Sequence, residues 1–110
     1  MKKIGIINAQ ISAVIAQLGH TDTLVIADAG FPIPATTQRI DLALTKGIPG
    51  FLDTLRVVLT EMQVERAIVA EEMLKVSPDI HRAIKELLGD VPIEAVPHSA
   101  FKERARSACA

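Results

Sequence analysis

Cysteine is almost absent from this chain of 110 residues, since Cys109 is the only one. A single cysteine excludes an internal disulfide. No charged residue stands next to Cys109 that would activate its thiol, so we interpret it as an incidental thiol. The chain's histidines, His20, His81 and His98, do not form with it the closely spaced ligand pair of a zinc site. The sequence therefore predicts no bound metal.

Long apolar runs are also missing, and no stretch approaches the roughly 20 residues that span a bilayer. The two lysines after Met1 are not followed by the apolar core of a secretory signal. The chain has twelve basic and thirteen acidic residues, which gives a formal net charge of -1. This balance provides no general attraction to nucleic acid or to an anionic membrane. We expect a cytoplasmic protein with neither as a partner.

The composition that remains is ordinary for a globular protein, with 49% hydrophobic and 23% charged residues. Its length suits one small domain, and no repeat or low-complexity tract divides it. Apolar periodicity predicts helices after Asn8, Gly50 and Ser77 and a final helix capped by Ser99. Four short apolar runs predict strands at residues 23–27, 40–44, 67–70 and 93–96. This alternation indicates an α/β fold, a single layered domain with a mainly parallel sheet flanked by helices.

The most informative stretch places His20 after the first predicted helix and Asp28 at the end of the first predicted strand. Ligands bind at the carboxyl ends of strands in open α/β sheets, so the two side chains could line one pocket. The imidazole can transfer protons near neutral pH. Structural alternatives remain open: His20 could complement a helix dipole, and Asp28 could close a turn onto Gly30. A phosphoacceptor role for Asp28 is a further alternative.

His98 follows the fourth predicted strand, and Lys102 lies four positions later. Residues four apart share one face of a helix, so both could face the same cleft if the helix begins at His98. The alternative is a solvated helix whose first turn is polar. Lys102 does belong to a charged run with Glu103, Arg104 and Arg106.

Together these features resemble the D-ribose pyranase and L-fucose mutarotase family, with the ribose branch closer than the fucose branch. The similarity covers almost the whole chain. The matching motifs are LGHTD at 18–22, IADAG at 26–30 with prolines at 32 and 34, IDL at 40–42, GIP at 47–49, PH at 97–98 and FKE at 101–103.

The resemblance implies an isomerase without a cofactor that interconverts β-D-ribopyranose and β-D-ribofuranose by acid/base ring opening and reclosure. The family's proton-donating histidine matches His20. Positions that contact the sugar match Asp28 and His98, and Lys102 is a neighbour expected to bind substrate. The resemblance also implies homo-oligomers, as rings of five subunits or paired decamers, with pockets near the subunit interfaces.

One departure from the family pattern affects these expectations. Family members carry a later segment with a Tyr-x-Asn motif that contacts sugar and completes the sheet, whereas this chain contains no tyrosine. We therefore expect residues 1–110 to form a single sugar-isomerase domain that lacks the C-terminal strand segment. The alternative function is a catalytically impaired sugar-binding or assembly module of the same fold.

Overall fold

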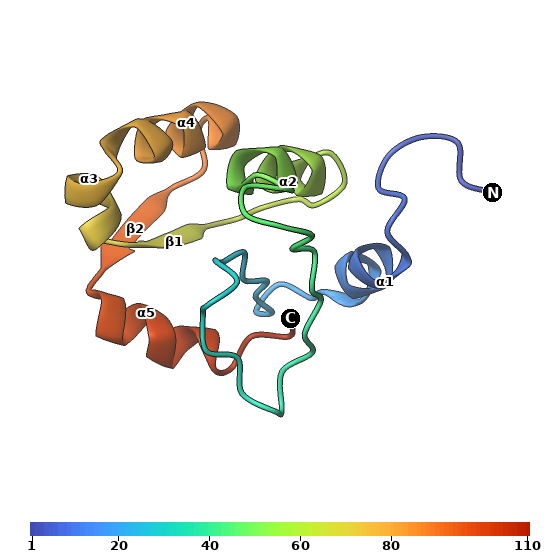
Figure 1. Ribbon diagram of the computed structural model, residues 1–110, viewed down its shortest axis with the longest axis horizontal. Helices are drawn as coiled ribbons and strands as arrows, with labels where there is room; N and C mark the ends of the chain where they lie inside the picture. Colours follow the sequence, from blue (N-terminus) through green and yellow to red (C-terminus); the bar gives the residue numbers. More distant parts are fainter.

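The structure is a computed structural model that describes residues 1–110. Along the chain its elements are α1 (Ala9–Gln17), α2 (Phe51–Leu59), β1 (Ala67–Ala70), α3 (Glu72–Val76), α4 (Pro78–Leu88), β2 (Ile93–Val96) and α5 (His98–Ala105). Figure 1 shows the strand pair between α2 and α4 on one side and α5 on the other, with α1 set apart near the amino terminus. This arrangement confirms the predicted α/β class.

The sheet consists of β1 and β2, which pair in parallel. The register places Ala67 opposite Ile93 and Ala70 opposite Val96. Parallel strands cannot be joined by a tight hairpin, and here α3 and α4 form the crossover between them. Both strands therefore end at the same edge of the sheet, where α3 and α5 begin. The third and fourth strands predicted from the sequence are confirmed.

The helix predicted after Ser77 is confirmed as α4. Pro78 occupies its first turn, where a missing backbone N–H costs nothing. The helix ends at Gly89, whose φ of 61° lies in the left-handed region that favours glycine. Ile84 is its buried residue. The short helix α3 was not predicted from the sequence.

The helices predicted after Asn8 and Gly50 are confirmed as α1 and α2. The side-chain oxygen of Asn8 accepts a hydrogen bond from the backbone N–H of Ile11 at 2.9 Å, which caps α1. No helix is long and apolar enough to cross a bilayer; the longest, α4, has 11 residues.

The predicted capping role of Ser99 is wrong. The final helix, α5, begins at His98, and its N-cap residue, two residues before Ser99, is Pro97, which makes no side-chain capping bond. Instead, the backbone N–H of His98 donates to both carboxylate oxygens of Glu72, at 3.0 and 3.2 Å. A side chain from α3 thus satisfies one of the free N–H groups at the start of α5.

The predicted strands at residues 23–27 and 40–44 are wrong, because both segments lie outside the sheet. A strand needs a neighbouring backbone that pairs with it along its length. Segment 23–27 has only two such hydrogen bonds, with residues 109–110, and segment 40–44 has one, from the N–H of Leu44 to the carbonyl of Ile48.

Alternate residues of these two segments are nevertheless covered over most of their length. A small core forms around Ile6, Ile11 and Val58. Leu24, Ile26, Ile40 and Leu42 of the two extended segments pack against it, whereas Leu44, the next alternate residue, is exposed. The covered side chains therefore follow a period of two as far as Leu42, even without a sheet.

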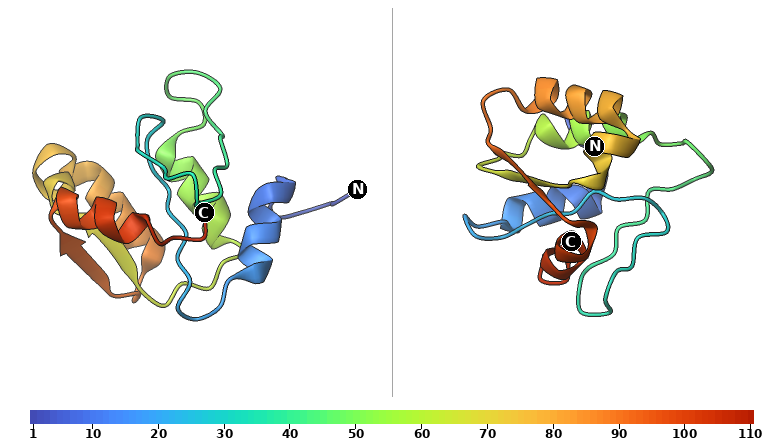
Figure 2. Two further views of the ribbon diagram at one scale, coloured as in Figure 1. Left: turned by 90° about the horizontal axis from the view of Figure 1, so that it is seen from below. Right: turned by 90° about the vertical axis from the view of Figure 1, so that its left-hand side faces the viewer.

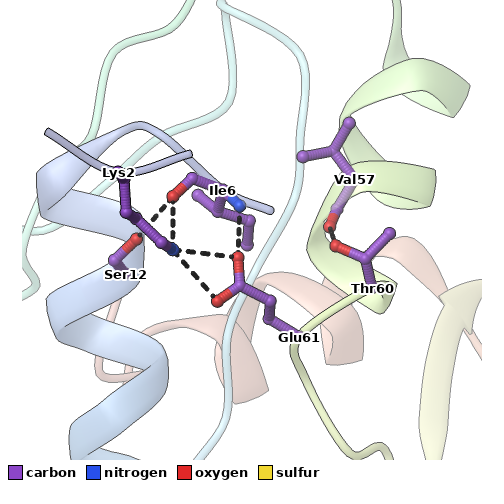
Figure 3. Close-up of polar contacts among 6 residues, drawn as sticks. All are labelled: Lys2, Ile6, Ser12, Val57, Thr60 and Glu61. Carbon is purple, nitrogen blue, oxygen red and sulfur yellow. Dashed lines mark hydrogen bonds and ion pairs between the residues drawn. The ribbon is translucent and has the colours of Figure 1, made fainter. Parts of the chain in front are cut away.

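The amino-terminal segment is held against the end of α2 by the contacts in Figure 3. The backbone N–H of Ile6 donates to Oε2 of Glu61, and Nζ of Lys2 lies 3.2 Å from Oε1 of the same carboxylate. Nζ of Lys2 also donates to the carbonyl of Ile6 at 2.6 Å. Gly5 has a φ of 77°, and a Cβ there would lie 2.7 Å from Oε2 of Glu61. The left-handed φ therefore favours glycine at this position, whose lack of a Cβ also leaves room for the Glu61 carboxylate.

These contacts stabilise the ionised form of Glu61. The hydrogen bond from Ile6, and after it the one from Lys2, lower the pKa of Glu61 below its ordinary value of 4.5. A carboxyl group whose pKa is lower in the folded than in the unfolded state stabilises the fold above the unfolded value. This contribution is lost as the pH falls through the folded value.

We therefore expect Glu61→Gln to lower the melting temperature at neutral pH, and the difference from the parent chain to shrink as the pH falls below 4.5. Thermal unfolding followed by circular dichroism across this pH range measures the difference. Glu86→Gln, an exposed substitution on α4, is the matched control. A difference that stayed constant with pH would contradict the role of the Glu61 charge.

Candidate functional site

An open hollow of about 840 Å³ lies between the segment of residues 24–50 and α2. Figure 2 shows this segment as loops beside α2, with the carboxyl terminus near them. The lining is largely apolar, with a few polar side chains that include Asp28. Apolar walls with a few polar groups are typical of a small-molecule site.

Asp28 lies where the extended segment turns. The backbone N–H of Phe31 donates to the carbonyl of Asp28 at 3.0 Å, so the main chain, rather than the carboxylate, closes this turn. The residue is exposed and lines the hollow. Its carboxylate is therefore available to a ligand in the hollow.

The loop after Asp28 is attached to α5 by aromatic packing. The rings of Phe31 and Phe101 meet edge to face, with centroids 5.7 Å apart and an interplanar angle of 86°. Beside this contact, Lys102 and the two prolines of the loop, Pro32 and Pro34, line a second, shallower depression. The pair of rings thus brings the loop that carries Asp28 to the helix that carries Lys102.

Two carboxylates hold α5 against the sheet. Glu72 binds the backbone N–H of His98, and its Oε2 lies 4.0 Å from Nδ1 of the same residue. Further along, Arg104 donates to both oxygens of Glu94 on β2, at 3.1 and 3.2 Å. The hydrogen bonds from Arg104, its charge and that of Arg66 lower the pKa of Glu94 below 4.5. The ionised pair fixes α5, and with it the positions of His98 and Lys102.

His20 lies elsewhere, in a turn directly after α1. The turn is closed by Asp22, whose Oδ2 accepts from the backbone N–H of Gly19 at 2.8 Å. Nδ1 of His20 lies 2.5 Å from Oε1 of Glu65, in the segment that leads into β1. The hollow is lined by Asp28 but not by His20. The expectation that both line one pocket is therefore not met within a single chain.

Of the four candidate residues, Asp28 lines the hollow and Lys102 the second depression, whereas neither His98 nor His20 lines either one. Asp28 and Lys102 are connected through the contact between the loop and α5, and His98 begins the same helix. His20 faces Glu65 instead. Glu65 was missed from the sequence, because a carboxylate 45 positions away in a connecting segment gives no local signal.

The arrangement suits hydrogen bonding and proton transfer. An imidazole beside a carboxylate can exchange a proton, and Asp28 and Lys102 provide an acceptor and a donor for hydroxyl groups. No group of three His, Cys, Asp or Glu side chains lies close enough together to hold a metal ion.

Comparison with known proteins gives one consistent result. The sequence model of the RbsD / FucU transport protein family matches residues 1–110. A D-ribose pyranase of Laribacter hongkongensis is 56% identical over 98% of this chain and 82% of its own length. One of Yersinia pestis is 53% identical over 96% of this chain and 82% of its own length. The structure of Bacillus subtilis RbsD complexed with D-ribose is similar with a TM-score of 0.95 and 40% identity, over 99% of this chain and 83% of that one.

Phe101→Ala tests whether the aromatic pair holds the loop. An edge-to-face pair contributes about 0.5–1.5 kcal/mol beyond its buried area, so its loss should raise hydrogen exchange at the Phe31 amide roughly 2- to 12-fold. Hydrogen exchange measured by NMR gives this rate, and the amides of β1 serve as the internal control. An unchanged rate at Phe31 would show that other contacts hold the loop.

Proposed function

The chain belongs to the RbsD / FucU family, and on that premise we propose that it is a sugar isomerase that interconverts the pyranose and furanose forms of D-ribose. The observation that carries this proposal is the 56% identity, over nearly the whole chain, with a protein named D-ribose pyranase. The similar Bacillus subtilis structure is a complex with D-ribose, which supports this sugar as the ligand.

In this reaction one bond between the anomeric carbon and a ring oxygen breaks and another forms, and protons are transferred at each step. A base removes the proton of the anomeric hydroxyl, and an acid protonates the ring oxygen as the bond between that oxygen and the anomeric carbon breaks. The open-chain aldehyde then recloses through the hydroxyl on carbon 4 in place of that on carbon 5. Each step needs acid/base chemistry and positioning, and neither oxidation nor reduction occurs.

The four candidate residues divide these tasks. His20 protonates the ring oxygen, since imidazole donates and accepts protons near neutral pH. Asp28 orients a sugar hydroxyl as a hydrogen-bond acceptor, since this residue is exposed and lines the hollow. His98 and Lys102 bind further hydroxyls from α5. The connection of Asp28 to α5 through the Phe31–Phe101 pair supports a shared binding role for these three residues.

The protein assembles as a homo-oligomer, a ring of five or a decamer, and His20 of one subunit completes the hollow of a neighbouring one. Two features support this assembly. His20 and the hollow lie apart in one chain, and large apolar side chains remain exposed, including Ile4, Ile7, Leu44 and Ile48. Residues 1–110 act as one cytoplasmic sugar-isomerase domain in each subunit. Light scattering during size-exclusion chromatography measures the assembly.

Saturation-transfer NMR on D-ribose tests the function directly. Saturating the anomeric proton of β-D-ribopyranose in the presence of the protein should reduce the β-D-ribofuranose signal beyond the reduction without protein. L-fucose, observed for exchange between its anomers, serves as the comparison sugar. Ribose binding without faster exchange would instead identify a catalytically impaired binding module, and an absence of both would contradict the proposal.

His20→Ala should reduce the catalysed exchange by about 10²–10⁴-fold, the usual contribution of a positioned general acid or base. The same saturation-transfer experiment measures it. His81→Ala, which removes a histidine from α4 far from the proposed site in sequence, is the matched control and should retain the parental rate. Parental exchange in the His20 variant would contradict the assigned role.

A further inference from the structure

We propose that Glu65 is a positioning residue for His20, which it holds through Nδ1 so that Nε2 exchanges the proton with the sugar. The inference rests on the proposed isomerase function. Its physical basis is the contact of 2.5 Å between Nδ1 of His20 and Oε1 of Glu65.

The backbones that carry the two side chains are both anchored. His20 lies in the turn in which the Asp22 carboxylate binds the backbone N–H of Gly19, and the N–H of Asp22 returns to the carbonyl of Gly19 at 3.2 Å. On the other side, Glu65 is followed after one residue by β1, where the N–H of Ala67 donates to the carbonyl of Pro92 at 3.0 Å. The carboxylate therefore meets the imidazole from a segment tied to the sheet.

The exposure of His20 makes this contact decisive for its orientation. Within one chain the His20 side chain is 91% exposed, so no packing in that chain determines how the ring is turned. The hydrogen bond to Glu65 is its one polar side-chain contact in the chain. Without that bond the ring would be free to rotate, and its reactive nitrogen would point at the substrate for only part of the time.

The contact also determines which nitrogen carries the proton. An ionised carboxylate only accepts hydrogen bonds, so Nδ1 of His20 must be the protonated nitrogen that faces Glu65. Nε2 then accepts a proton when the ring is neutral and donates one when the ring is cationic. The same atom thus serves ring opening and ring closure, as a reversible isomerisation requires.

The competing interpretation is an ordinary surface ion pair. Glu65 is 59% exposed, and exposed pairs contribute little to stability. Such a pair would affect the melting temperature slightly and the chemistry not at all. The two interpretations therefore differ in kcat, whereas the tautomer of His20 reports whether the contact itself forms.

Glu65→Ala tests the proposal, with Glu65→Asp as the conservative variant and Glu86→Ala as the control for loss of an exposed carboxylate. We expect the alanine variant to lower kcat for ribose exchange roughly 10- to 100-fold, the range found for carboxylates that orient metal-binding histidines. KM should stay near the parental value, because the proposed role of Glu65 is to orient His20 rather than to bind the sugar. The aspartate variant should recover part of the loss, and the control should match the parent.

A spectroscopic measurement accompanies the kinetics. Long-range ¹H–¹⁵N correlation spectra should show neutral His20 as the tautomer protonated at Nδ1 in the parent chain, and a mixture richer in the Nε2 tautomer in Glu65→Ala. Parental kcat in that variant, or an unchanged tautomer, would overturn the proposal. If the parent itself showed no ribose exchange, the proposed function would fail, whereas parental exchange with no effect of Glu65→Ala would remove only the role of Glu65.

Discussion

The parallel pairing of β1 with β2 is the constraint on which the arrangement of the site depends. Parallel strands place their carboxyl ends at one edge, so α3 and α5 both begin there. This is why Glu72 at the start of α3 can bind the first N–H of α5, at His98. The Glu94–Arg104 pair then fixes the far end of the same helix. A sheet of only two short strands therefore determines where the side chains of α5 face the loop that carries Asp28.

The other half of the site is held by side chains rather than by regular structure. Residues 19–50 contain no helix and no strand, and their backbone hydrogen bonds are scattered. The Phe31–Phe101 contact and the packing of alternate residues against Ile6, Ile11 and Val58 hold this segment in place. Segments with few backbone bonds open at low free-energy cost. Such a segment can adjust to a ligand, while the strand pair and α5 remain fixed.

Sequence periodicity predicts local structure well where the determinants are local. Asn8, Pro78 and Gly89 act within one turn of their helices, and the boundaries they predict are found. The start of α5 was predicted two residues late because its capping group, Glu72, comes from a different helix. The strands at 23–27 and 40–44 failed because a strand depends on a partner that alternation does not reveal. The same limit applies to the site: motifs indicate His20, Asp28, His98 and Lys102, but only the folded chain shows Glu65 beside His20.

The sugar site that we propose lies where the loop carrying Asp28 meets α5. Titration of the ¹⁵N-labelled protein with D-ribose, followed by backbone chemical shifts, tests this claim most directly. We expect the changes to concentrate at residues 28–34 and in the first half of α5, around His98 and Lys102, with α4 unaffected. Changes confined to α3 and α4, on the other side of the strand pair, would contradict it.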